Sequence, residues 1–301
     1  MSPVALFFAS GESLYPGTAL LLIAVATRIS RRSLIVWLGR ISTWVGIAFM
    51  IMACPPFSWG IDVFFGVLFL AWLLSGSPRG ATSGWDVSRI AITVAFAIAL
   101  LALSTLEIRH RRWPAIHGER SDHVVVIGDS ISAGLGSGVP PWPQMLHEMT
   151  GAGIKNLSKP GATVTDGLAM AKFVVPEDHL VLIELGGNDL ISGERSDDFE
   201  RSLDALLAKL ASPSRTLIMF ELPLLPNVVR YGEIQRSLAG KYGVWLIPKR
   251  CIAKVLSGKD ATSDGLHLTD AGARRMESLV AQILLPVLTF QRTPTTPATR
   301  P

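Results

Sequence analysis

Two short polar segments, far apart in the chain, hold the residue types that an acyl-transfer reaction needs. Gly128–Ser130 directly follows the apolar run His123–Ile127, and Asp264–His267 lies ahead of the last amphipathic stretch. A serine hydroxyl is a weak nucleophile that needs a base beside it, and a histidine base needs a carboxylate that fixes its tautomer. The spacing of Asp264 and His267 in a turn lets both side chains lie on one side. Each segment alone is also compatible with an ordinary turn, with a capping serine or an incidental histidine.

Two further segments could stabilise negative charge on a substrate oxygen. Gly186–Asp189 contains Asn188, whose side-chain N–H is a neutral donor that can face a developing oxyanion. Lys159–Ala162 contains Gly161, where the missing Cβ lets the backbone approach a substrate and its N–H donate. As isolated features, both segments are glycine-containing turns.

The elements between these segments predict a sheet that would bring them together. From residue 123, short apolar β-branched runs alternate with amphipathic stretches, which predicts parallel strands covered by helices on both faces. The predicted strands are His123–Ile127, Ile154–Leu157, Leu180–Leu185, Thr216–Leu222 and Val244–Ile247. The predicted helices are Trp142–Thr150, Val164–Phe173, Asp197–Leu210, Val228–Tyr242 and Asp270–Leu288. Function collects at the carboxyl ends of parallel strands, so residues 123–290 are expected to form a three-layer α/β/α sandwich with the polar segments at one edge.

The ordered set of segments resembles the SGNH hydrolases, also called the GDSL family. The matching blocks are Gly128–Gly134, Gly161, Gly187–Asp189 and Asp264–His267, in the order of the family. The stretches Ile183–Asp189 and Val139–Leu146 are similar to the bacterial thioesterase and arylesterase branch. Two positions depart from the commoner pattern: Ile131 stands where leucine is more frequent, and Leu268 where that branch often has proline. The departures leave the catalytic atoms in place and put only the sub-branch, and so the substrate, in doubt.

The resemblance implies a fold and a set of roles. The fold would be flavodoxin-like, with a five-stranded parallel sheet. Ser130 would be the nucleophile, His267 the base and Asp264 the residue that orients it, with no metal or cofactor. The oxyanion hole would consist of the backbone N–H groups of Ser130 and Gly161 and the side chain of Asn188. Asp129 would have a structural role in the nucleophile loop.

The implied activity is hydrolysis of carboxylic esters or thioesters through an acyl-enzyme. Candidate substrates are small esters or thioesters, lipids and acylated glycans. One alternative is a carbohydrate O-acetylesterase of the cell envelope. Another is an O-acyltransferase, although family members that move acyl groups across membranes are fused to more membrane spans than this chain has. A non-enzymatic alternative is a membrane-anchored binding module with a relic site, which the complete set of catalytic residues disfavours.

The N-terminal third has the composition of a membrane region. Hydrophobic residues make up 49% of the whole chain and charged residues 17%, and the mean hydropathy is +0.39, which is too apolar for an ordinary soluble domain. Residues 1–106 hold four apolar runs and predict four spans, or three if the first and shortest does not cross. The runs are Leu14–Thr27, Ile41–Phe57, Trp59–Ser75 and Ile90–Leu106. Residues 107–122 are expected to be a polar linker and residues 291–301 a disordered tail.

The arginines predict the orientation. Arginines 28, 31, 32 and 40 separate the first two runs, and Arg79 and Arg89 separate the last two, which places both loops in the cytoplasm by the positive-inside rule. The domain after residue 106 would then lie on the extracytoplasmic side of the inner (plasma) membrane. Arginines 109, 111, 112 and 120 argue against this. The arginine excess flanks apolar runs, so we expect the bilayer and not nucleic acid as the partner.

Overall fold

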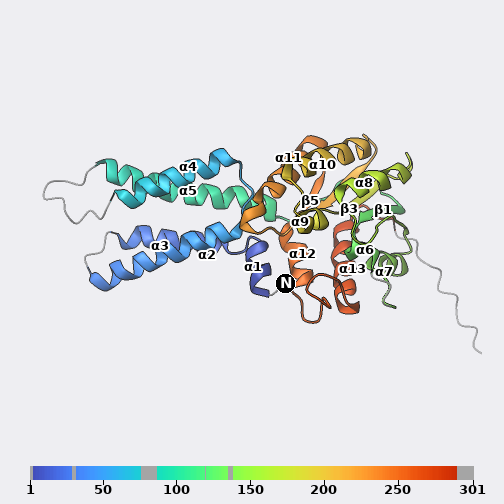
Figure 1. Ribbon diagram of the computed structural model, residues 1–301, viewed down its shortest axis with the longest axis horizontal. Helices are drawn as coiled ribbons and strands as arrows, with labels where there is room; N and C mark the ends of the chain where they lie inside the picture. Colours follow the sequence, from blue (N-terminus) through green and yellow to red (C-terminus); the bar gives the residue numbers. More distant parts are fainter. Residues whose placement is uncertain (1–2, 29–31, 76–86, 119, 135–137, 290–301) are drawn as a thin grey trace, which may run out of the picture. The chain divides into compact units, whose positions relative to one another are not determined.

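The structure is a computed structural model that describes residues 3–28, 32–75, 87–118, 120–134 and 138–289. The chain divides into two compact units (Figure 1). One unit contains Trp113–Leu222 and the chain from Ile234 onward, and the other contains Val4–Arg112 and Pro223–Glu233. The expected tail, residues 291–301, lies outside the described residues.

The first unit is built on a five-stranded parallel sheet. Its strands are β1 (His123–Gly128), β2 (Gly153–Asn156), β3 (Leu180–Glu184), β4 (Thr216–Phe220) and β5 (Trp245–Ile247). The order across the sheet is β2-β1-β3-β4-β5, and every neighbouring pair is parallel. All five residues of β3 are buried, which explains its unbroken apolar run, because helices cover both faces of such a sheet.

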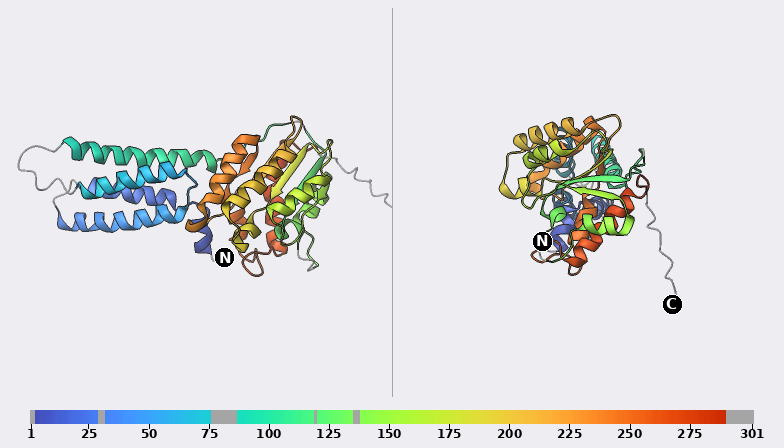
Figure 2. Two further views of the ribbon diagram at one scale, coloured as in Figure 1. Left: turned by 45° about the horizontal axis from the view of Figure 1, so that its top comes forward. Right: turned by 90° about the vertical axis from the view of Figure 1, so that its right-hand side faces the viewer.

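Helices cover the two faces of this sheet in the predicted three-layer arrangement (Figure 2). On one face lie α7 (Trp142–Thr150), α12 (Lys249–Leu256) and α13 (Asp270–Leu284), and on the other α8 (Val164–Met170), α10 (Ser196–Leu210) and α11 (Val229–Tyr242). Two short helices, α6 (Ser130–Ala133) and α9 (Gly187–Ser192), begin at the ends of β1 and β3. The 3-10 turn η2 (Ala171–Phe173) also belongs to this unit, whereas η3 (Pro226–Val228) belongs to the other. The α/β/α fold class is thereby confirmed, while α12 was not among the predicted helices.

Among the residues that the structure describes, the N-terminal part of the second unit contains five helices, and η3 and the start of α11 also belong to this unit. The five helices are α1 (Pro3–Ala9), α2 (Leu14–Thr27), α3 (Ser33–Ala53), α4 (Trp59–Leu74) and α5 (Val87–Arg111). Helix α3 begins eight residues before the predicted run, so Arg40 lies inside the helix and not in a loop. It ends where Cys54 adopts a left-handed conformation, with φ of 46°, ahead of two prolines. Helix α5 continues through the first residues of the predicted linker to Arg111.

Two of these helices are long and apolar enough to cross a membrane among the residues that the structure describes. These are α3 and α5, and the pair α1 and α2, bent by 74°, could make a third crossing. Helix α4 is apolar but has only 16 residues. Of the arginines used for orientation, Arg31 and Arg79 lie outside the described residues.

Close backbone packing and polar contacts hold the helical unit together. A Cβ added to Gly46 would lie 3.0 Å from the carbonyl oxygen of Gly17, so α2 and α3 need glycine there. Thr18 and Ser104 form a buried hydrogen bond of 2.9 Å between α2 and α5. The Arg28 guanidinium lies over the Trp72 ring, 3.7 Å from its centroid. Close approach at small residues and interhelical polar contacts therefore hold the helices of this unit together.

The segment Pro223–Glu233, which follows β4 in sequence, packs within the helical unit. The Leu224 N–H donates to the Ala9 carbonyl oxygen at 3.2 Å. A Cβ on Gly232 would lie 2.8 Å from Cγ of Pro56. The N-terminal helices therefore supply packing to a segment within the stretch 123–290, and experiments on activity should use the full-length chain.

Candidate active site

Ser130 lies at the carboxyl end of β1, where the chain turns into α6. Asp129 caps this helix, and its Oδ1 accepts the Ile131 N–H at 2.9 Å. The cap fixes the turn, because it satisfies an N–H that has no partner inside the helix. Ser130 is 8% exposed, and within the described part of the chain its Oγ makes no hydrogen bond. The strand-to-helix turn thus leaves the hydroxyl available to a substrate.

His267 and Asp264 form the pair that the sequence predicts. His267 Nδ1 lies 2.6 Å from Asp264 Oδ2, while Asp264 Oδ1 accepts the N–H groups of His267 at 2.8 Å and Leu266 at 2.9 Å. The backbone N–H of His267, then its ring and the N–H of Leu266, hold the pKa of Asp264 well below its usual range. An ionised carboxylate on Nδ1 keeps that proton in place, so Nε2 is the nitrogen that can accept one.

Two observations place the His267 segment beside the nucleophile turn. Ser130 and Leu268, the residue after His267, line one pocket. His267 also lies near enough to Asp129, the residue before Ser130, to act on it electrostatically, although burial raises the pKa of Asp129 overall. The hydrogen bonds of the described residues do not include one between Ser130 Oγ and His267. Hydrogen bonds of this type are often long or misaligned until a substrate binds.

The two segments expected to stabilise an oxyanion meet at Asp129 and Ala162. Asn188 Nδ2 donates to Asp129 Oδ2 and to the Ala162 carbonyl oxygen, both at 3.0 Å. Gly161 has φ of +76°, a conformation that glycine adopts without strain. The N–H groups of Ser130 and Gly161 donate to no atom in the part of the chain that the structure describes. Loops that follow β1, β2 and β3 therefore come together here, as the sequence predicts.

Glu184, to which the sequence motifs assign no role, lies beneath this group. It is the last residue of β3 and is 5% exposed. Its Oε2 accepts the Ser132 hydroxyl at 2.8 Å and the Asp129 N–H at 3.4 Å. Burial, then the charge of Asp129, raises the pKa of Glu184 well above its ordinary value. A carboxylate in an otherwise apolar strand is the signal that could have found it.

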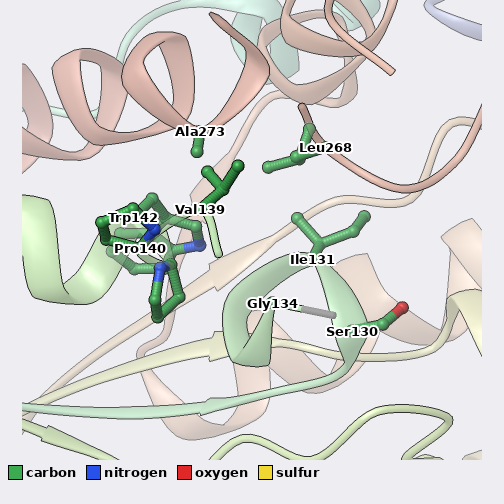
Figure 3. Close-up of a pocket in the computed structure, with 9 residues that line it drawn as sticks. Ser130, Ile131, Gly134, Val139, Pro140, Trp142, Leu268 and Ala273 are labelled. Carbon is green, nitrogen blue, oxygen red and sulfur yellow. The ribbon is translucent and has the colours of Figure 1, made fainter. Parts of the chain in front are cut away.

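The pocket beside Ser130 is lined mainly by apolar side chains. Its other residues are Ile131, Gly134, Val139, Pro140, Pro141, Trp142, Leu268 and Ala273. Figure 3 shows Ile131, Val139 and Leu268 gathered together, with Ser130 at the edge of the group and its Oγ turned away. Among the described residues, no three His, Cys, Asp or Glu side chains come together so that they could hold a metal ion. The site offers an apolar surface next to a hydroxyl.

The comparisons with known proteins identify the class of enzyme. Residues 126–275 match the model of the GDSL-like lipase/acylhydrolase family. The thioesterase 1/protease 1/lysophospholipase L1 of Escherichia coli K12 is 26% identical over 178 residues, which cover 53% of this chain and 86% of that protein. Esterase TesA of Pseudomonas aeruginosa is 27% identical over 180 residues, which cover 55% and 89%. A crystal structure of TesA is 26% identical, covers 55% of this chain and 99% of that one, and has a TM-score of 0.49.

The fold is a parallel α/β/α sandwich with a serine at the end of its first strand. Together with the family match and the curated relatives, it defines a serine ester hydrolase. The chain belongs to the GDSL-like lipase/acylhydrolase family through residues 126–275. The family resemblance seen in the sequence is confirmed. The match leaves out the N-terminal helices, so they are an addition to the family domain.

Proposed function

We propose that this chain cleaves carboxylic esters or thioesters with Ser130 as nucleophile, His267 as general base and Asp264 as the carboxylate that orients the base. The observation that carries the proposal is the 2.6 Å contact between His267 Nδ1 and Asp264 Oδ2, in a segment that lines the same pocket as Ser130. A base held in one tautomer at the nucleophile is the minimum that serine hydrolysis requires.

The reaction proceeds in two acyl-transfer steps. In the first step, His267 Nε2 takes the proton of Ser130 Oγ as this oxygen bonds to the ester carbonyl carbon. The tetrahedral intermediate collapses when the bond to the leaving oxygen or sulfur breaks, and His267 returns the proton to that atom. Water then attacks the acyl-enzyme, His267 accepts its proton, and Ser130 Oγ leaves with that proton as the acid is released. The ionised Asp264 stabilises the imidazolium in both steps.

The oxyanion forms beside the loops that follow β1, β2 and β3. The N–H groups of Ser130 and Gly161 are donors that the described fold leaves uncommitted, and they would bind the oxyanion directly. Asn188 Nδ2 already donates to Asp129 and Ala162. It would serve as the third donor by exchanging the Ala162 contact for the substrate oxygen. Donors placed in advance at the developing charge are worth about 3 kcal/mol each.

The lining of the pocket favours an acyl or aryl ester over an acylated glycan. Ile131, Val139, Trp142 and Leu268 present hydrocarbon and aromatic surface beside Ser130. Such a surface gains free energy by burying apolar groups, whereas a sugar would need polar partners for its hydroxyl groups. The carbohydrate O-acetylesterase interpretation is therefore the less well supported one.

A covalent probe tests the nucleophile. A fluorophosphonate should add to Ser130 when Oγ bonds to phosphorus and fluoride leaves, because only an activated serine reacts with it. The full-length chain in detergent is treated with the probe, digested and analysed by mass spectrometry. The adduct is expected on Ser130 in the folded chain and on no residue in a heat-denatured control. Modification of another serine in its place would contradict the proposal.

We further propose that the helical unit anchors the enzyme in the membrane. Large apolar side chains on its helices are exposed, including Trp44 at 61%, Phe64 at 64% and Ile98 at 61%. Monomeric soluble proteins rarely expose contiguous apolar surface on this scale. The arginines near the first and third connections favour a cytoplasmic location for both, which puts the hydrolase domain on the extracytoplasmic side of the inner membrane.

The distribution of lysines allows a direct test of this orientation. Every lysine of the chain lies after residue 122, so lysine adducts, identified by mass spectrometry after digestion, report on the hydrolase domain alone. A membrane-impermeant amine reagent is expected to label the protein in spheroplasts with intact membranes as fully as in detergent-lysed ones. Labelling that appears only after lysis would place the domain in the cytoplasm. A cytoplasmic control protein, unlabelled before lysis, verifies that the membranes are intact.

A further inference from the structure

The turn that carries Ser130 rests on a buried hydrogen-bond network that the proposed reaction does not use. Glu184 Oε2 accepts from the hydroxyl of Ser132 and from the N–H of Asp129. Trp142 Nε1 in turn donates to Ser132 Oγ at 3.2 Å. Asp129 and Ser132 stand on either side of the nucleophile in sequence. One carboxyl group thus holds both sides of the turn.

The same carboxyl group is linked to the side chain of Asp129. The two side chains share a hydrogen bond, and two facing carboxyl groups can share one only if one of them keeps its proton. Burial raises the pKa of Glu184 well above its ordinary value, whereas both oxygens of Asp129 accept N–H groups, from Ile131 and from Asn188, which stabilise its ionised form. Asp189 and His267 also act electrostatically on Asp129. Glu184 is therefore the neutral acid, and it donates to the Asp129 carboxylate.

Asp129 links Glu184 to the residues proposed to bind the oxyanion. Its Oδ1 accepts the Ile131 N–H at 2.9 Å, and its Oδ2 accepts from Asn188 Nδ2 at 3.0 Å. Ile131 belongs to α6 and Asn188 to α9, the two short helices that begin at the ends of β1 and β3. Loss of the Glu184 proton or side chain would leave the Asp129 carboxylate short of a donor and the Ser132 hydroxyl short of an acceptor.

We propose that Glu184 is a positioning residue for ester hydrolysis, which acts as a neutral carboxylic acid to hold the Ser130 turn and, through Asp129, the Asn188 side chain. The inference rests on the function proposed above. Errors of about 1 Å in the placement of reacting groups cost on the order of 10²-fold in rate. Loss of the Glu184 contacts should therefore lower kcat. Substrate contacts are made elsewhere, so KM should be spared.

A pair of isosteric variants separates this role from a purely structural one. Glutamine reproduces the neutral acid, because its amide can donate to Asp129 while its oxygen accepts from Ser132. Leucine fills a similar volume with no polar atom. In the full-length chain in detergent, Glu184→Gln should keep kcat for an aryl ester within about threefold of wild type. Glu184→Leu should lower kcat by on the order of 10²-fold, with KM changed by less than about threefold.

Several outcomes would overturn the inference. They are a Glu184→Gln variant that loses as much kcat as Glu184→Leu, a Glu184→Leu variant with wild-type kcat, or a change confined to KM. Thermal unfolding of each variant establishes that it is folded. If leucine prevents folding, Glu184→Met, with a more adaptable apolar chain, takes its place. Ser130→Ala, measured in the same assay, separates the two proposals. If Ser130→Ala retains activity, the proposed function itself is wrong. If Ser130→Ala is inactive and Glu184→Leu is fully active, only the positioning role is wrong.

Discussion

Replacing Ser130 with alanine is expected to lower kcat for a short-chain aryl ester by on the order of 10⁴-fold or more. The substitution removes the one atom that forms the acyl-enzyme and keeps the backbone N–H proposed for the oxyanion hole. Substrate binding should therefore persist while turnover disappears. The measurement is release of the aryl alcohol by the full-length chain in detergent, followed at several substrate concentrations to separate kcat from KM.

A second serine serves as the control for this experiment. Ser212 Oγ lies 3.2 Å from Ser214 Oγ in the connection before β4, at the amino end of the sheet. Ser212→Ala should leave kcat within about twofold of wild type, because a half-exposed serine at the amino end of the sheet stabilises no part of the reaction. If both variants hydrolysed the ester alike, another group would have to be the nucleophile.

The sequence predicted the sheet and its functional edge because these depend on local pattern. β1 and β3 are buried on both faces, so they read as continuous apolar runs bounded by glycine and polar residues. Since parallel strands end at one edge, the segments at Ser130, Gly161 and Asn188 could be expected together. The same reasoning located Asp264 and His267 as a pair, because their spacing alone limits how far apart they can lie.

What the sequence did not predict depends on contacts between distant segments. Glu184 could be read as the end of β3, but its partner Ser132 lies 52 positions away and becomes visible only in the fold. The packing of Leu224 against Ala9 joins parts of the chain that composition assigns to different domains. Helix α12 has only eight residues, too few for a clear periodic pattern.

The boundaries of the N-terminal helices were predicted less well than their existence. Hydropathy located α2 to the residue, but it placed the start of α3 after Arg40, where the apolar run becomes continuous. The helix begins earlier, because a long arginine side chain can lie along a helix and reach a polar surface. Charge near a helix end is therefore a poor marker of where that helix begins.

The second large effect is expected from His267→Ala, which should lower kcat for the same aryl ester by about 10³- to 10⁴-fold. Alanine removes the group that takes the Ser130 proton and returns it to the leaving group. KM should change far less, because the apolar pocket that holds the substrate is lined by other side chains. The loss should also abolish fluorophosphonate labelling of Ser130, since the serine is no longer activated.

The chain offers a matched control for this variant. His123 Nδ1 lies 2.6 Å from Asp122 Oδ1, the same separation as between His267 and Asp264, but at the amino end of β1. His123→Ala breaks an Asp–His pair of the same separation at the amino ends of the strands. It should change kcat by no more than about twofold. Equal losses in the two variants would mean that the pairs act on folding. An unaffected His267→Ala would mean that another base serves Ser130. The proposal predicts that only His267→Ala loses kcat. The Asp–His separation is the same in both pairs, so such a result would show that the position of His267 at the carboxyl ends of the strands gives it its role.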